Sequence, residues 1–207
     1  RVLGVDNFGL LAFATAFIAY FNIITSYGFD LTATKEISVN RDNHDKLVEI
    51  YSSVMTIKML LMVFSFAVMA IIVFSFEKFS EDWEIYFLSF GVVVGQALFP
   101  VWLFQGLERM KYITYINVLA KTIFTVAIFI FVQNQRDYFW VPLLTSVGYI
   151  IAGGYSIWIV NKTIGLKFKL QSREKILFYL NDGWHIFTSQ IYVSLYTTIN
   201  ILILGLF

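Results

Sequence analysis

The chain has 207 residues, of which 58% are hydrophobic and only 14% are Asp, Glu, Lys or Arg. Soluble domains carry about 25% charged residues, so this composition excludes an ordinary soluble domain and predicts a membrane protein. Cysteine is absent, which excludes disulfides, thiolate metal sites and a cysteine nucleophile. The sequence shows no nucleotide-binding loop, metal-ligand cluster or catalytic triad. We therefore expect no cofactor, no nucleic-acid partner and no enzyme activity.

Long apolar runs lie between short clusters of charge. A hydrocarbon core of about 30 Å needs about 20 helical residues, and lipid offers no partner to open backbone groups. The strand alternation of a membrane barrel is absent. We predict an all-α, polytopic transmembrane helix bundle whose six spans cover residues 8–31, 48–76, 85–107, 112–135, 138–161 and 183–207.

The distribution of Lys and Arg between the loops predicts the orientation. The loops after the first, third and fifth spans hold ten basic residues, and those after the second and fourth hold only Lys78 and Arg136. The first set should face the cytoplasm, with "TKEISVNRDNHDK" at 34–46 as the first inner loop. Aromatic residues at the outer ends of the third and fifth spans agree with this: Trp83, Tyr86, Tyr138 and Trp140.

Both ends of the sequence suggest an internal piece of a longer membrane protein. The chain opens on Arg1, with no Met and no signal peptide, and it stops within the apolar run "INILILGLF". The first span should start on the outer side. If the native N-terminus is cytoplasmic, an odd number of spans, most simply one, precedes this chain.

Three stretches carry a resemblance to a known family. They are "FGLLAFATAFIAYFNIITSYGFDLTATKEIS" at 8–38, "FPVWLFQGLERMKYI" at 99–113 and "NDGWHIFTSQIYVSLYTTINILILG" at 181–205. Together they resemble the Wzx-type flippases of O-antigen and polysaccharide repeat units, within the multidrug/oligosaccharidyl-lipid/polysaccharide exporter superfamily. That family has about a dozen helices in two pseudo-symmetric halves. The resemblance implies that this chain covers helices two to seven, with the lobe boundary near 162–182.

The resemblance also implies a function. Such proteins move an undecaprenyl-pyrophosphate-linked oligosaccharide from the inner to the outer leaflet of the bacterial inner membrane, by rocking two halves around a central cavity. Implied partners are the lipid-linked oligosaccharide, membrane lipid, a coupling ion (H⁺ or Na⁺), and a polysaccharide polymerase with its chain-length regulator. No covalent chemistry is involved.

Lys121 is the first candidate for the substrate pathway. Ten residues separate it from Lys111, which places it about 15 Å into the fourth span. A Lys facing lipid at this depth costs about 2.5–3.5 kcal/mol, so the ammonium group should face a water-filled cavity. The alternative is a side chain that snorkels to the inner interface.

Three further ionisable residues have two interpretations each. Lys58 faces either the cavity or the interface, in which case residues 48–57 form an interfacial turn. Asp30 either caps the end of the first span or couples protons. His185, placed at a helix start just after Gly183, either makes interfacial contacts or relays protons.

Other residues of the third span have packing or gating interpretations. Gln96 and Gln105 should face the bundle interior, and Gly91 and Gly95 form a small-xxx-small packing pair. Pro100 should kink the helix, for alternating access or for shape alone. At the end of this span, Glu108 and Arg109 form either an interface anchor or a gate.

Two other functions compete with a flippase. A drug or metabolite antiporter of the same superfamily should carry an acid within its spans, and Asp30 is the candidate, near a span end. A membrane glycosyltransferase or polymerase needs large outer loops. The outer loops "EKFSEDW" and "QNQRD" are too short for one.

Overall fold

A computed structural model describes the backbone of residues 3–206 and the side chains of residues 3–194. The described part of the chain is helical, as the sequence predicts for an all-α bundle. In chain order the elements are α1 (Gly4–Ser26), α2 (Phe29–Val39), α3 (His44–Ser75), α4 (Glu77–Ser80), α5 (Trp83–Leu98), α6 (Val101–Gly106), α7 (Lys111–Phe131), η1 (Gln135–Phe139), α8 (Trp140–Ile159), η2 (Val160–Ile164) and α9 (Arg173–Leu206).

Five segments of the described chain are long and apolar enough to cross a membrane. They are Gly4–Val39, His44–Ser75, Trp83–Gly106, Lys111–Phe131 and Gln135–Ile164. Each contains or overlaps one of the first five predicted spans. The sixth predicted span, 183–207, lies largely within α9, and its side chains from residue 195 onward lie outside the described residues. That span remains a prediction.

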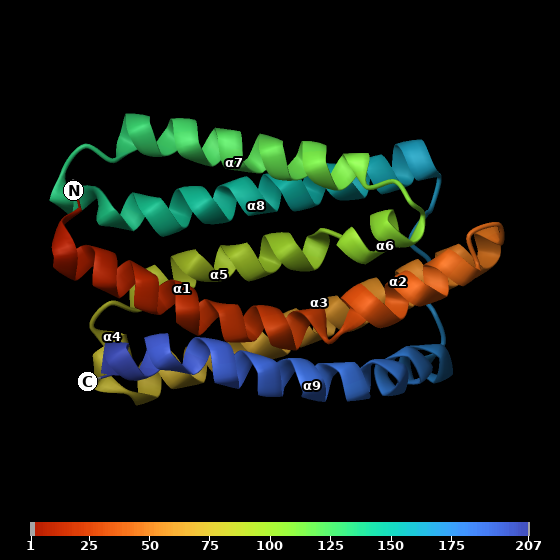
Figure 1. The fold of residues 1–207 in the computed structure, drawn as a ribbon, viewed down its shortest axis with the longest axis horizontal. Coiled ribbons are helices and arrows are strands. Elements are labelled where there is room, and N and C mark those ends of the chain that lie inside the picture. The colour runs from red at the N-terminus through yellow and green to blue at the C-terminus, as the bar shows by residue number, and fades with distance from the viewer. Residues whose placement is uncertain (1–2, 207) are drawn as a thin grey trace.

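The helices run back and forth between two ends of the bundle (Figure 1). The connections α2–α3, α6–α7 and α8–α9 lie at one end, and α3–α5 and α7–α8 lie at the other. The basic loops therefore gather at a single end, as the predicted orientation requires. Following that prediction, we call this the inner end of the bundle and the opposite one the outer end.

The closest helix contact is between α5 and α8. A Cβ atom at Gly91 would lie 2.5 Å from the Cβ of Ser146, and one at Gly95 would overlap the backbone of Tyr149. From the other side, a Cβ at Gly153 would lie 2.6 Å from the carbonyl oxygen of Gly95. Small residues allow two backbones to approach in this way, so the predicted packing role of Gly91 and Gly95 is confirmed.

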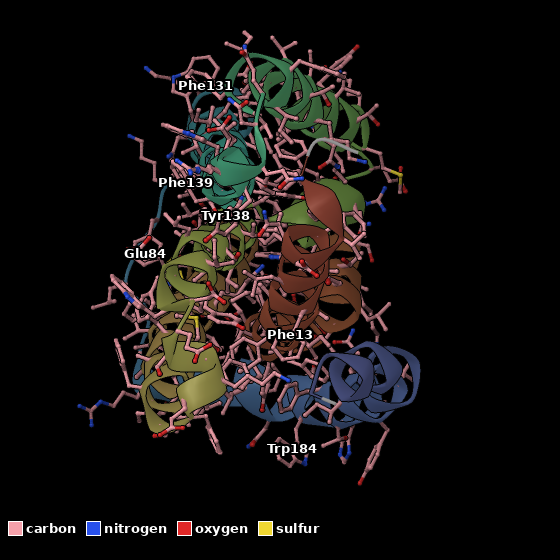
Figure 2. All side chains as sticks on the ribbon, turned by 90° about the vertical axis from the view of Figure 1, so that its left-hand side faces the viewer. Phe13, Glu84, Phe131, Tyr138, Phe139 and Trp184 are labelled. Atoms are coloured by element: carbon pink, nitrogen blue, oxygen red, sulfur yellow. The ribbon has the colours of Figure 1, made fainter. Side chains whose placement is uncertain are left out.

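Aromatic side chains fill the outer half of the bundle core. Phe17 packs edge-on against Phe21 and Tyr86, and Phe79 of the short helix α4 closes the cluster. In the end-on view, α7 and α8 lie at one side of the bundle and α9 lies at the opposite side (Figure 2). Helix α7 packs mainly on α8, and among its side chains only Ile116 and Ala120 are buried.

The first inner connection is shorter than the sequence suggested. Residues 34–46 were expected to be a loop, but α2 continues the first span as a helix to Val39. The apolar side chains of Phe29, Ala33 and Ile37 recur every four residues and are all buried, which explains a helix here. Between α1 and α2 the chain turns at Tyr27 and Gly28, with φ angles of 50° and 78°.

The third span is broken rather than kinked. Helix α5 ends at Leu98, Phe99 and Pro100 are not helical, and α6 starts at Val101. Pro100 has no N–H to donate to the carbonyl of Gln96, and it disfavours a helical conformation at Phe99. The predicted disturbance at Pro100 is thus correct in position but larger than a kink.

Two further helices are longer than predicted. Helix α3 is continuous from His44 to Ser75, so residues 48–57 form no interfacial turn. Helix α9 starts at Arg173, so His185 lies well inside a helix rather than at its start. Tyr179, which is 2% exposed, anchors this added segment against the bundle.

Candidate functional site

Three cavities with shared lining residues lie between the helices of the bundle. The first, about 520 Å³, lies between α1, α2 and α9; the second, about 250 Å³, between α1, α5 and α8; the third, about 310 Å³, between α7 and α8. Asn22 lines the first and second, and Thr145 and Tyr149 line the second and third. We call these three cavities together the polar track, after the polar side chains in their largely apolar walls, and the second of them the central cavity.

Lys121 lies in the third cavity. Its neighbours on α7 are Asn117 and Thr125, each one helical turn away, so the three polar side chains share one face. Thr145 and Tyr149 of α8 form the facing wall. Other faces of α7 expose apolar side chains such as Val126 and Phe129. The helix therefore has a polar stripe with a cation midway along its length, and it exposes apolar side chains on its other faces.

The walls of the central cavity carry no formal charge, and they combine polar side chains with as many apolar ones. Asn22 and Gln96 contribute side-chain amides, and Thr15, Ser89, Thr145 and Tyr149 contribute hydroxyls. The amide oxygen of Asn22 is buried and has no hydrogen-bond partner among the described residues. Gln96 thus faces the interior, as predicted, and its side chain is accessible from a cavity.

Asp30 lies at the inner end of the polar track. It is exposed, occupies the first turn of α2, and lines the first cavity with Ser189 and Gln190 of α9. An acidic side chain in a first turn interacts favourably with the helix dipole. Asp30 is not a cap, however, because the N-cap of α2 is Gly28 and no side chain caps this helix. Its position in the cavity also leaves it accessible to a cation.

Lys58 lies inside the bundle and not at an interface. Its side chain is buried, the residue being 3% exposed, and its Nζ donates to the carbonyl oxygen of Gln96 at 3.3 Å. That carbonyl is the one that Pro100 leaves without its usual helical donor. Asp30 is close enough to act electrostatically on the ammonium group. Lys58 therefore supports the helix break, and it does not line the polar track.

The remaining candidates lie away from the polar track. Gln105 is half-buried in α6, and His185 is exposed on α9. Glu108, with a φ of 56°, accepts a hydrogen bond from Arg41 at 2.9 Å and so links two inner loops. Arg109 and Glu108 also line an open cavity of about 860 Å³ at this end.

A cluster around Glu49 fastens α9 to α3 at the inner end. The Glu49 carboxylate pairs with Lys46 at 2.6 Å and with Lys175 of α9 at 2.5 Å, and the Tyr179 hydroxyl donates to it at 3.3 Å. Burial raises the pKa of Tyr179, and the negative charge of Glu49 raises it further. The connecting segment is held as well, because the Lys169 N–H donates to the Ser52 hydroxyl at 3.0 Å.

Sequence reasoning missed several residues of the polar track. Asn22, Thr15, Thr145 and Tyr149 are single polar residues within otherwise apolar runs, and each alone has many explanations. A signal existed on α7, where Asn117, Lys121 and Thr125 recur every four residues. The meeting of α1, α5 and α8 around one cavity has no comparable signal in the sequence.

These features define a polytopic helical membrane protein with a polar surface inside the membrane. The model of the family described as "Polysaccharide biosynthesis protein" matches residues 1–207, so the chain belongs to that family. With five helices that can span a bilayer, it is part of a multi-pass protein of the bacterial inner membrane.

Two curated relatives share the name "Putative O-antigen transporter". The protein of Escherichia coli (strain K12) is 31% identical over 212 residues, covering 99% of this chain and 49% of the relative. That of Shigella dysenteriae is 27% identical over 207 residues, covering 100% of this chain and 52% of the relative. The chain thus spans about half the length of each. No solved structure gives a significant match.

Proposed function

We propose that the protein containing this chain is a flippase. It would move undecaprenyl-pyrophosphate-linked oligosaccharide repeat units from the inner to the outer leaflet of the inner membrane by alternating access, without covalent chemistry. Family membership and the names of the two relatives support transport of a polysaccharide precursor. The observation that supports the proposal is the polar track, with Lys121 lining it midway along α7.

The two parts of a lipid-linked sugar need opposite environments, one polar and one apolar. Its sugar and pyrophosphate lose their hydration when they enter hydrocarbon, while its polyprenyl tail is most stable there. The polar track supplies hydroxyls, amides and one cation in place of water. An ammonium group in a cavity of low effective dielectric attracts a pyrophosphate more strongly than in bulk water. The apolar outer faces of α7 and α8 leave the tail in lipid.

Alternating access needs places where helices can bend. This chain offers the turn at Tyr27 and Gly28 and the break at Phe99 and Pro100, which both lie beside the polar track. The other half of the protein would complete the cavity. A coupling ion, H⁺ or Na⁺, would bind at Asp30, and a polymerase with its chain-length regulator would receive the translocated unit.

Complementation tests the proposal. In a flippase-null cell carrying the full-length gene, Lys121→Ala should lower surface polysaccharide about tenfold or more, since losing an attraction of about 1.4 kcal/mol costs a factor of ten. Lys121→Arg should retain part of the activity. The matched control is Lys111→Ala, which removes an exposed cation at the start of the same helix.

Surface polysaccharide would be scored on gels beside a membrane blot for protein level. Full activity of a normally expressed Lys121→Ala variant would remove Lys121 from the transport pathway. Equal loss in the Lys121→Ala and Lys111→Ala variants would point to a general effect of positive charge instead.

A further inference from the structure

We propose that the segment between η2 and α9, residues 165–172, binds the headgroups of anionic phospholipids at the inner surface of the membrane. We call this segment the inner connector. Figure 1 shows it running along the inner end of the bundle from α8 to the start of α9. The proposal concerns membrane phospholipid rather than the transported substrate, so it does not depend on the flippase function.

The backbone of the inner connector is fixed at two points. Gly165 turns the chain with a φ of 83°, and the Leu166 N–H donates to the carbonyl of Val160 at 3.2 Å. The Leu166 side chain is completely buried, and the Lys169 N–H donates to the Ser52 hydroxyl of α3 at 3.0 Å. Most of the other side chains of the connector are exposed. A fixed backbone therefore presents them outward, ready for a partner.

The inner connector and its flanks carry cations without carboxylate partners. Residues 160–176 contain five basic residues and a single acid, Glu174. Lys175 pairs with Glu49. The other four are exposed and make no ion pair with any described residue: Lys162, Lys167, Lys169 and Arg173. The other two inner connections differ, because Arg41 and Glu108 pair across them at 2.9 Å. A cluster of unpaired cations beside a membrane attracts anionic headgroups.

Apolar side chains lie among these cations. Phe168 and Leu170 alternate with the two lysines and are 55% and 77% exposed. Leu177 and Phe178 in the first turns of α9 are exposed as well. A surface that combines Lys and Arg with exposed Phe and Leu suits the boundary between headgroups and acyl chains, where both kinds of side chain find a favourable environment.

An aromatic pair indicates how close the inner connector lies to the headgroups. The rings of Tyr155 and Trp158 on α8 stack with their centroids 5.7 Å apart, and both side chains are exposed. Exposed Tyr and Trp are enriched at membrane–water interfaces. Lys162 follows Trp158 by four residues, which is about one helical turn. The unpaired cations therefore begin about one turn beyond the expected level of the interface, where lipid phosphates lie.

Quenching by brominated lipids tests the proposal. Leu170→Cys, in full-length protein without other cysteines, would carry a fluorescent label. The protein would be reconstituted into liposomes of phosphatidylcholine and phosphatidylglycerol, with one of the two lipids brominated at a time, so that quenching reports which lipid lies beside residue 170. We expect a preference for phosphatidylglycerol of about tenfold at low salt. Added salt should weaken the preference, because it screens exposed charges.

Two double variants assign the preference to the inner connector. Lys167→Gln with Lys169→Gln should lower the preference to about threefold or less, while both lipids still quench the label. The matched control is Lys35→Gln with Lys111→Gln, which removes the same charge from two other exposed positions toward the inner end and should keep the preference.

Three outcomes would overturn the proposal. If neither lipid quenches the label, the inner connector faces water or another protein. If both lipids quench it equally in the protein with its native lysines, the connector meets the membrane without selecting anionic headgroups. If the two double variants lose the preference equally, the preference arises from the total charge of the inner end and not from the connector.

Discussion

Lys58 shows how one residue can compensate for another within the membrane. An unpaired buried charge is costly, and a proline inside a membrane helix leaves an unpaired carbonyl. Here the buried charge and the carbonyl satisfy each other. The ammonium group of Lys58 donates to the carbonyl oxygen of Gln96, to which Pro100 cannot donate because it has no N–H. The Phe99 N–H donates to the same oxygen at 3.3 Å, so the carbonyl has two donors. We infer that Lys58 stabilises the break between α5 and α6.

A double-mutant cycle tests this role of Lys58. Lys58→Met should lower the thermal midpoint of the full-length protein in detergent. Pro100→Ala restores an N–H that can donate to Gln96, so Lys58→Met should cost less in that background. We expect a coupling of about 1 kcal/mol, the size of one hydrogen bond. As the control, Lys111→Met should be additive with Pro100→Ala. Additivity of Lys58→Met as well would contradict the role.

Residue roles were only partly predictable from the sequence. Helix length alone placed Lys121 within the membrane, and the structure places it at a cavity. For Lys58 the same argument left cavity and interface open, and the structure supports neither of them. The missing information was the neighbour across the bundle, since Gln96 is 38 residues away in the sequence.

At the scale of elements, the contact between α5 and α8 determines how the middle of the bundle packs. Gly95 and Gly153 bring the two backbones together, while Ser156 donates to the carbonyl of Leu98 at 3.2 Å, next to the helix break. No side chain larger than hydrogen fits at Gly95 without moving α8.

Gly95→Ala should therefore destabilise the protein. Its Cβ would overlap the Tyr149 backbone, and overpacking costs about 1–3 kcal/mol. The matched control is Gly154→Ala on α8, where a Cβ meets no atom within 4 Å and helix propensity should make the change neutral or slightly stabilising. Thermal melts of the full-length protein in detergent measure both. Equal midpoints would show that α5 and α8 are not tightly packed in the membrane.

Hydropathy predicted the membrane helices better than the amphipathic ones. The first five spans stand out as long uncharged or nearly uncharged runs, and the structure has a helical segment for each, of which the first and third are divided into two helices. Helix α2 and the start of α9 mix charges with apolar residues, so a search for uninterrupted apolar runs assigned them to loops. Their buried residues, Ile37 and Tyr179, depend on partners from distant elements.

At the scale of the whole molecule, the chain spans about half the length of the two curated relatives described above. Helix α7 packs on one side only, and the polar track opens between α1, α7, α8 and α9. In the flippase that we propose, the second half faces this track and encloses the sugar. The ion pair of Glu49 with Lys175 would hold α9 against α3 at the inner end during the movement.

Translocation by purified full-length protein in liposomes tests the central claim most directly. The liposomes would carry a fluorescent undecaprenyl-pyrophosphate-linked oligosaccharide, and an impermeant quencher added outside would report the lipid in the outer leaflet. The account predicts that inner-leaflet lipid reaches the quencher with wild-type protein, and about tenfold or more slowly with Lys121→Ala, the loss expected for about 1.4 kcal/mol. A quenching trace with wild-type protein identical to that of protein-free liposomes would contradict it.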